Sequence, residues 1–467
     1  MALHRTSRDA GTSQDFLTTR PQFARAGEVQ PIPRLRLPDT EMDADTAFQV
    51  VHDELILDGS SRLNLATFVT TWMDPQAERL MALTLDKNMV DKDEYPQTAE
   101  LELRCVHMIA DLWNAPQSEA ATGTSTVGSS EAVMLGGLAL HRKWRARQAA
   151  AGKPTDRPNF VTGINVQVAW EKAARYWDIE LRTAPMAEGR LHLTADEAVK
   201  LVDENTIGVI AVLGSTFDGS YEPVKEISDA LDKLQAETGL DVPIHVDGAS
   251  GGFVAPFLDP DLEWDFRVPR VRSINASGHK YGLVYPGVGW VIWRDSSDLP
   301  EDLVFHVNYL GGDMPTFALN FSRPGSQVVA QYYNLIRLGH TGYRRIHQAS
   351  RDTAMHLSEG IDAMGSFRLL SRGDELPVFS FALKDDVKNF TVYDLAAKLR
   401  ERGWLVPSYS LPADLEDTHV IRLVIRNGFS RDMADILLTD IAAAVSYFDG
   451  LSGPMPHDPA HTPSFHH

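Results

Sequence analysis

A lysine stands where an apolar strand should end in the segment SINASGHKYGL, residues 273–283. This Lys280 must be either paired or chemically used, because burial of an unpaired ammonium group is costly. A second apolar strand, in IHVDGASGGF, ends at Asp247, and the small residues after it let another molecule approach the backbone. Two interpretations stay open for the pair: a buried ion pair, or an acid and an amine that serve a bound molecule.

A loop rich in Gly, Ser and Thr precedes a long helical pattern in ATGTSTVGSSEAVMLGGLALHRKW, residues 121–144. Ser129 and Ser130 would cap this helix, so that hydroxyl groups and free backbone N–H groups face one point. Such a helix start can bind phosphate, although Ser-Ser is also an ordinary cap. The loop is not a P-loop, because no Gly-Lys-Ser/Thr follows its glycines.

The three features together match the needs of pyridoxal 5'-phosphate. That cofactor requires an anchor for its phosphate, a carboxylate that keeps the pyridine nitrogen protonated, and an amine for a covalent imine. The combination is more specific than any of its parts, and it predicts a site for this cofactor. No metal ion is expected.

Longer segments carry a resemblance to a known family. HVDGASGGFVAPF and SINASGHKYGL closely resemble the bacterial glutamate decarboxylases among the group II decarboxylases, which are fold-type I pyridoxal-phosphate enzymes. LNLATFVTTW, GTSTVGSSEA, NFSRP and RNGF extend the resemblance along nearly the whole chain from about residue 41. It implies decarboxylation of L-glutamate at the α-carbon to 4-aminobutanoate and CO2, with uptake of one proton.

The resemblance also implies roles for individual residues. Lys280 would bind the cofactor covalently, Asp247 would pair with its ring nitrogen, and Gln167 would lie over the ring face as the third catalytic residue. Further cofactor contacts would come from Ser129, Ser130 and His279 at the phosphate, from Thr216 and Ala249 near the ring, and from Phe321 and Ser322 of a second subunit. Substrate contacts would come from Thr67, Phe68, Asn88, Asp91 and Arg422.

Several alternatives stay open at these positions. Asp91 could be a solvated loop acid, and Arg422 could pair with an acid instead of orienting a substrate. The same fold could also serve a decarboxylase of an aromatic or other amino acid, or a catalytically silent binding protein. Turnover of other amino acids, or a colourless purified protein, would favour these two readings.

The end of the chain resembles a regulatory element of acid-adapted bacterial family members. In those enzymes a histidine next to the end enters the active site at neutral pH and adds to the cofactor, and His466 or His467 in SFHH could do the same. Only neutral imidazole is a nucleophile, so this plug would form above a histidine pKa of about 6.5. A disordered or tag-derived end is the alternative.

These residues need a scaffold that brings strand ends together. From about residue 121 to 325, short apolar strands alternate with helical patterns, which predicts an α/β fold with a mostly parallel sheet and a ligand site at the carboxyl ends of the strands. The expected strands are 159–163, 179–185, 207–214, 242–247, 273–277 and 287–293. Helices are expected at 169–177 and 224–239, and, as cover for the sheet, at 43–59 and 93–115.

The pattern changes after a long helical stretch around 326–365. Strands at 376–384, 404–410 and 419–426, with helices at 392–403 and 431–450, predict a smaller C-terminal α+β domain. We therefore expect an N-terminal arm and helical segment (1–60), a large fold-type I cofactor-binding domain (61–345), the small domain (346–452) and a tail (453–467).

Composition limits the partners and the compartment. The 467 residues carry 44 Lys and Arg against 64 Asp and Glu, a formal charge of −20, which disfavours nucleic acid and anionic membranes as partners. No apolar run approaches a membrane span and no signal-peptide pattern opens the chain, so we expect a cytoplasmic protein. The single cysteine, Cys105, excludes an internal disulfide and is expected to be a buried core thiol.

The resemblance also implies how the chain assembles. A homodimer would share each active site, and dimers would assemble to a hexamer through the amino-terminal arm. Plant relatives carry a calmodulin-binding extension, which would be a basic amphipathic helix with an aromatic anchor. LSGPMPHDPAHTPSFHH is not such a helix, so no calmodulin dependence is expected.

Overall fold

The computed structural model describes residues 33–307 and 314–455, and the predicted tail histidines lie outside these ranges. The chain divides into two compact units, Met1–Ser60 and Ser61–His467. The first contains α1 (Ala44–Leu55), where Asp43 caps the helix by accepting from the N–H of Thr46 at 3.2 Å. Its apolar residues Phe48 and Val51 are 68% and 59% exposed.

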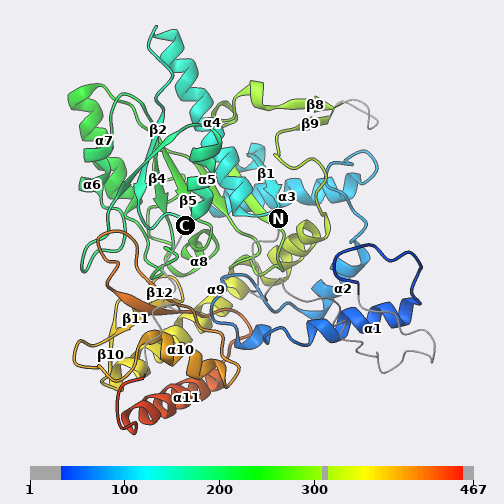
Figure 1. The fold of residues 1–467 in the computed structure, drawn as a ribbon. Helices are drawn as coiled ribbons and strands as arrows, with labels where there is room; N and C mark the ends of the chain where they lie inside the picture. The colour runs from blue at the N-terminus through cyan, green and yellow to red at the C-terminus, as the bar shows by residue number, and fades with distance from the viewer. Residues whose placement is uncertain (1–32, 308–313, 456–467) are drawn as a thin grey trace. The chain divides into compact units, whose positions relative to one another are not determined.

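A seven-stranded sheet forms the centre of the second unit, in the order β1-β7-β6-β5-β4-β2-β3 (Figure 1). Its strands are β1 (Thr122–Thr126), β2 (Asn159–Gly163), β3 (Glu180–Ala184), β4 (Thr206–Val212), β5 (Ile244–Asp247), β6 (Val271–Ala276) and β7 (Gly289–Trp293). The strands from β3 to β6 pair in parallel, whereas β7 runs antiparallel to both of its neighbours. The predicted mostly parallel sheet is thus confirmed.

The central strands are apolar along their whole length because helices cover both faces. Side chains alternate between the faces. In β4, Ile210 and Val212 pack with α4 (Ser129–Ala150) and α5 (Val168–Tyr176). Val209 and Ala211 belong to the core on the other face, to which α3 (Pro96–Leu112), α6 (Ala195–Leu201) and α7 (Val224–Thr238) contribute.

A second sheet of four antiparallel strands lies in the C-terminal part, in the order β10-β11-β13-β12. Its strands are β10 (Phe367–Leu369), β11 (Val378–Leu383), β12 (Ser408–Ser410) and β13 (His419–Val424), and α10 (Val392–Arg400) and α11 (Arg431–Asp449) share its core. Leu65, which lies about 300 residues earlier in the sequence than β10, also packs in this core. The N–H of Leu65 donates to the carbonyl of Leu405 at 2.9 Å, and its carbonyl accepts from the N–H of Val424 at 3.0 Å.

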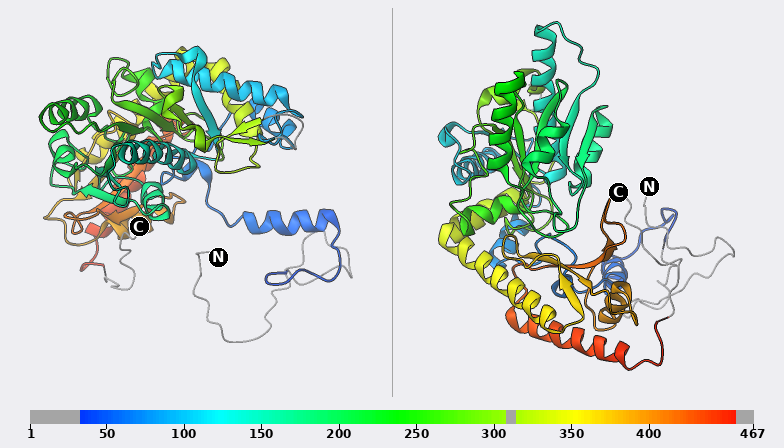
Figure 2. Two further views of the ribbon diagram at one scale, coloured as in Figure 1. Left: turned by 90° about the horizontal axis from the view of Figure 1, so that it is seen from above. Right: turned by 90° about the vertical axis from the view of Figure 1, so that its left-hand side faces the viewer.

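The long helix α9 (Ser326–Ala363) joins the two cores. It packs against α2 (Pro75–Leu83) and α3 near its start and against α11 near its end (Figure 2). The helix kinks at Gly339, where φ is 53° and ψ is −170°. That backbone geometry is readily available only to glycine.

The remaining elements are short. They are α8 (Ala255–Leu258), single 3₁₀ turns at Ser61–Leu63, Ser118–Ala120, Gly251–Phe253, Ser296–Asp298 and Glu301–Leu303, and the antiparallel pair β8 (Phe305–Val307) and β9 (Met314–Thr316).

Strand β1 departs from the sequence prediction, which placed a loop before Ser129. Residues Thr122–Thr126 pair instead with β7 at the edge of the sheet. Threonine is β-branched and favours strands, but the segment lacks the apolar residues that reveal the other strands. Gly123 allows close packing here, since a Cβ at this position would lie 2.5 Å from Cδ1 of Ile292.

Three further observations concern the class of protein. Cys105 is fully buried in the main core, which confirms the predicted core thiol. Within residues 33–307 and 314–455, no helix is long and apolar enough to cross a membrane. The same part of the chain contains no group of three or more His, Cys, Asp or Glu side chains that could hold a metal ion.

Candidate active site

Lys280 lies in the turn after β6, beside the carboxyl end of β5. Its Nζ lies 3.3 Å from Oγ of Ser250 and 5.2 Å from the ring centre of Phe68. No carboxylate lies within 4 Å of this ammonium group among the described residues, so the simple buried ion pair is not formed. Burial lowers the pKa of Lys280 to about 8; the charge of Asp247 opposes the shift and that of Arg422 adds to it.

Asp247 ends β5 and is held by three donors. Its Oδ1 accepts from Nδ2 of Asn275 at 3.0 Å and from the N–H of Ala249 at 3.1 Å, and its Oδ2 accepts from Nε1 of Trp170 at 2.9 Å. These three donors fix the position and orientation of the Asp247 side chain at the carboxyl ends of the strands.

The start of α4 approaches the same strand ends. Oγ of Ser129 lies 2.7 Å from Oγ of Ser277 and 3.2 Å from Nδ2 of Asn275, while Ser130 is exposed. Gly128 precedes them, and a Cβ there would lie 2.8 Å from Cε1 of His279. The helix start, with its free N–H groups, can therefore bind an anion next to the His279 ring.

His279 is held as a neutral side chain. Its Nδ1 accepts from the N–H groups of Gly287 and Val288, each at 3.3 Å. Burial, with a smaller contribution from the charge of Lys280, lowers the pKa of His279 to about 4. Its Nε2 then carries the ring proton.

The segment 64–71 is clamped beside Lys280. Oγ1 of Thr70 donates to the carbonyl of Lys280 at 2.6 Å, and the N–H of Thr70 donates to the carbonyl of His279 at 2.8 Å. From the other side, Arg426 donates to the carbonyl of Thr67 at 3.2 Å. These bonds place Thr67 and Phe68 at the lysine.

Arg422 on β13 faces Phe68, with its guanidinium carbon 4.8 Å from the ring centre. Its Nη1 donates to the carbonyl of Thr216 at 2.8 Å and its Nη2 to the carbonyl of Ala66 at 2.6 Å. The Nε of this buried side chain has no hydrogen-bond partner. Arg422 forms no salt bridge with an acid in the described chain, so no carboxylate of the chain compensates its positive charge, which can attract another anion.

Gln167 lies at the start of α5 and is exposed. Its Oε1 accepts from the N–H of Ala169 at 2.6 Å, which caps the helix. The same helix carries Trp170, whose Nε1 donates to Asp247. Gln167 therefore lies one helical turn before a residue that contacts Asp247.

Four of the predicted residues lie in a second group. Nδ2 of Asn88 donates to Oγ of Ser322 at 3.2 Å, next to the exposed Phe321, and the N–H of Asp91 donates to the carbonyl of Asn88 at 3.2 Å. In the described chain, no hydrogen bond or ion pair joins Asn88 or Ser322 to Lys280. We call Asn88, Asp91, Phe321 and Ser322 the second cluster.

Buried charges support the second cluster. Arg323 and Glu102 form a buried ion pair at 3.1 Å, which fixes the loop that carries Ser322. Oε1 of Glu131, in the first turn of α4, accepts from the N–H of Asn320 at 3.0 Å.

Sequence reasoning missed several residues that build the site. Trp170, Asn275 and Arg426 hold the predicted residues in place. Asn275 could have been found, because it lies at the end of a strand next to the Asp247 strand. Trp170 and Arg426 gave no such signal, because their contacts depend on how α5 and β13 are placed.

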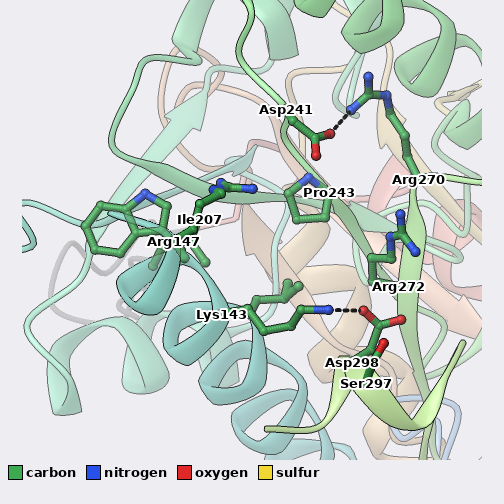
Figure 3. A pocket seen from close by; sticks show the side chains of 11 residues that line it. Lys143, Arg147, Ile207, Asp241, Pro243, Arg270, Arg272, Ser297 and Asp298 are labelled. Carbon is green, nitrogen blue, oxygen red and sulfur yellow. Dashed lines mark hydrogen bonds and ion pairs between the residues drawn. The ribbon is translucent and has the colours of Figure 1, made fainter. Parts of the chain in front are cut away.

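A cavity of about 190 Å³ lies at the opposite, amino-terminal ends of β4, β5 and β6 (Figure 3). Lys143 pairs there with Asp298, and Nη1 of Arg270 lies 3.1 Å from Asp241. None of the residues that line this cavity belongs to the predicted site.

Comparison with known proteins decides the family. The model of the pyridoxal-dependent decarboxylase conserved domain matches residues 38–384. The chain belongs to this family. As a pyridoxal-dependent decarboxylase it uses pyridoxal phosphate, and the carboxylate of Asp247, the amine of Lys280 and the open start of α4 fit that cofactor.

Relatives in this family resemble the chain over most of its length. It is 58% identical to a glutamate decarboxylase of Aliivibrio fischeri over 419 residues, which cover 89% of this chain and 90% of that relative. It is 54% identical to glutamate decarboxylase 5 of Arabidopsis thaliana over 428 residues, 91% of this chain and 86% of the relative. The solved structure of Lactobacillus brevis glutamate decarboxylase matches with a TM-score of 0.89 at 46% identity, covering 92% of this chain and 98% of that one.

Proposed function

We propose that this pyridoxal-dependent decarboxylase converts L-glutamate to 4-aminobutanoate and CO2 and consumes one proton in each turnover. The bacterial and plant relatives named glutamate decarboxylase support this substrate. The observation that carries the proposal is the buried Lys280 beside Arg422, whose Nε has no partner. An amine and an unpaired cation in one site suit an amino acid with carboxylate groups.

Different residues would hold the phosphate, the ring and the aldehyde carbon of the cofactor. These are Ser129, Ser130 and His279 at the phosphate, Asp247 at the ring nitrogen, Gln167, Thr216 and Ala249 around the ring, Lys280 as the covalent link, and Phe321 and Ser322 from a second subunit. When bound, pyridoxal phosphate supplies a positively charged ring that accepts the electron pair left by the departing CO2.

The charged residues of the chain have separate tasks in this reaction. The carboxylate of Asp247 would keep a proton on the ring nitrogen of the bound cofactor. Nζ of Lys280 loses its proton more readily than an ordinary lysine does, because burial has lowered its pKa to about 8. The positive charge of Arg422 attracts a carboxylate of the substrate and so orients it.

The distal carboxylate would contact Thr67 and the backbone of Phe68 from one chain and Asn88 and Asp91 from another. An aspartate beside a carboxylate is acceptable in acid, because one of the two acids can be protonated and donate a hydrogen bond. This arrangement favours activity at low pH. A role in acid resistance is therefore part of the proposal.

The second cluster supports a homodimer with shared sites. Asn88 and Ser322 contact each other and are joined to Lys280 by no hydrogen bond of the described chain, so a partner subunit is the natural recipient. Assembly to a hexamer through the amino-terminal arm is the further proposal, and the exposed apolar residues of α1 support it. We also propose a cytoplasmic location and a plug formed by His466 or His467.

Assay of 4-aminobutanoate formation from glutamate between pH 4 and 8 tests the reaction. We expect turnover that rises toward acid, and no comparable turnover of tyrosine, DOPA or histidine. Removal of residues 464–467 should extend activity toward neutral pH if the histidine plug operates. Sedimentation of the full chain and of a variant without residues 1–40 tests the hexamer.

Lys280→Ala serves as the control for the reaction. It should lose the absorbance of the covalently bound cofactor and the activity together. Equal turnover of glutamate and an aromatic amino acid would refute the proposed substrate, and an active monomer would refute the shared site.

A further inference from the structure

Asn275 contacts both ends of the cofactor site with one amide group. It lies on β6 directly opposite Asp247 on β5 and is fully buried. Its Nδ2 lies 3.0 Å from Oδ1 of Asp247 and 3.2 Å from Oγ of Ser129. These two residues are the proposed anchors of the ring nitrogen and of the phosphate.

A buried histidine holds the other side of the same amide. His245 lies two residues before Asp247 on β5, and its Nε2 is 2.7 Å from Oδ1 of Asn275. Its Nδ1 is 2.7 Å from Oγ of Ser273, which lies two residues before Asn275 on β6. Because side chains two residues apart share a face of the sheet, all four lie on one face.

The side chains of Ser273, His245, Asn275 and Asp247 form a hydrogen-bonded row. Its donors and acceptors have one consistent assignment. The amide must turn its NH2 group toward Asp247, because an oxygen there would face a carboxylate. Its Oδ1 then accepts, so Nε2 of His245 carries the ring proton. Nδ1 of His245 in turn accepts the hydroxyl proton of Ser273.

The neutral state of His245 fits this assignment. The side chain is fully buried, and burial lowers its pKa to about 4. Around the ring, Asp247 is the charged group on its own strand; Asn275 and Ser273 face it from β6, Trp170 from α5, and Gly136 from α4. A Cβ at Gly136 would lie 2.5 Å from Cε1 of His245, so helix α4 leaves the ring no room to turn.

The row also directs the hydroxyl proton of Ser129. Its Oγ accepts from Nδ2 of Asn275 and from Oγ of Ser277 at 2.7 Å. A hydroxyl oxygen accepts two hydrogen bonds and donates one. With both acceptor positions used, the proton of Ser129 points away from the sheet, toward an incoming anion.

We propose that Asn275, locked in one amide orientation by His245, is a positioning residue that sets the carboxylate of Asp247 and the hydroxyl of Ser129 together. The inference rests on the proposed function, since it concerns how that site receives pyridoxal phosphate. Because Asn275 contacts both side chains, a change in its orientation would alter both the affinity for the cofactor's phosphate and the position of the carboxylate at the ring nitrogen.

Substitution of His245 separates this role from simple packing. His245→Gln retains an N–H donor near the position of Nε2, whereas His245→Leu fills similar space without one. For His245→Leu we expect the dissociation constant of pyridoxal phosphate to rise about tenfold or more and kcat to fall by a similar factor, the loss expected for a charge-linked hydrogen-bond network. KM for glutamate should change less than about twofold, because His245 touches none of the proposed substrate residues.

Three measurements separate a positioning role of His245 from a loss of folding. Cofactor affinity is measured by equilibrium dialysis, the protonation of the bound cofactor by its absorbance from pH 5 to 9, and folding by thermal unfolding of the apoprotein. His245→Gln should stay within about threefold of the wild type in affinity and spectrum. Equal affinities and spectra for the Gln and Leu variants would overturn the proposal.

A second variant covers the case in which His245→Leu does not fold. Asn275→Asp removes both N–H donors and places a carboxyl beside Asp247, where two such groups cannot both ionise. Weaker cofactor binding and a shifted absorbance titration are expected, and wild-type values in both would overturn the proposal. A failure of glutamate turnover in the wild type would refute the proposed function alone, because the cofactor measurements do not depend on that substrate.

Discussion

At the scale of single residues, Arg422 joins parts of the chain that are far apart in sequence. It donates to the carbonyls of Thr216 and Ala66, which are 206 and 356 residues away. A planar guanidinium can hold both carbonyls through Nη1 and Nη2 and still carry its positive charge into the site, whereas an ammonium group on a flexible stem cannot match that geometry.

Arg422→Lys should therefore impair the site although the charge is kept. We expect kcat/KM for glutamate to fall at least about tenfold, the value of one lost charge-assisted hydrogen bond. Steady-state kinetics with the exposed Arg345→Lys as the control check this. Wild-type kinetics in Arg422→Lys would show that the bidentate hold is not required.

The lowered pKa of Lys280 makes cofactor uptake depend on pH. Only the neutral amine can form the covalent link, so the rate of uptake by the apoprotein should rise with pH around a midpoint of about 8. Arg422 contributes to the lowering, and Arg422→Met should move the midpoint to higher pH. Stopped-flow absorbance measures the rate, and an unchanged midpoint in the variant would contradict this electrostatic account.

Cys105 should be unreactive in the folded protein. Burial, with a smaller effect from the charge of Glu102, raises the pKa of this fully buried thiol well above its usual value. The thiolate is the reactive form, so a chromogenic disulfide reagent should label no thiol in native protein and one after denaturation. Rapid labelling of the native state would show that α3 opens locally.

At the scale of elements, Glu222 ties together the ends of several segments. Its Oε1 accepts from the N–H of Leu193 and from Nδ2 of Asn165, each at 2.9 Å, and its Oε2 accepts from the N–H of Val212 at 2.6 Å. Burial raises its pKa from 4.5 to about 7, and the three donors only partly oppose that shift.

Glu222 should make stability depend on pH. The folded state binds the proton more tightly than the unfolded chain, so this stabilisation is complete below about pH 4.5 and is lost as the pH rises through about 7. Glu222→Gln should remove up to about 3 kcal/mol of this pH-dependent change in the free energy of unfolding. Urea unfolding of the apoprotein at pH 5 and pH 8 measures it, with the exposed Glu237→Gln as the control; identical pH profiles for both variants would contradict the assignment.

The elements show what sequence can predict here. Runs such as IGVIAV mark strands buried on both faces, so the parallel sheet could be predicted, whereas the polar β1 could not. The proximity of Lys280 and Asp247 could be predicted, because the two strands that precede them follow each other along the chain, and these strands do pair in the sheet. Trp170 could not be assigned to Asp247, because that contact depends on the position of α5 over the sheet.

At the scale of the whole molecule, the second cluster should serve a partner's Lys280. Lys280→Ala and Asn88→Leu would each inactivate both sites of a homodimer, but a mixed dimer would contain one site with both residues intact. Random reassociation of equal amounts should restore about a quarter of wild-type activity.

Activity of the mixture after mild dissociation and reassembly measures this restoration, with each variant reassembled alone as the control. If no activity returns although mixed dimers form, Asn88 acts in its own subunit.

The place of Leu65 in the second core also has a consequence for synthesis on the ribosome. Its partners Leu405 and Val424 are made about 340 to 360 residues later. At 5–20 residues per second this interval lasts roughly 20 to 70 s. The clamp on the segment 64–71 also needs Arg422 and Arg426, so it closes only after residue 426 has been made. A nascent chain shorter than this therefore carries Lys280 without an assembled pocket, and catalysis begins only after Arg426 has emerged from the ribosome.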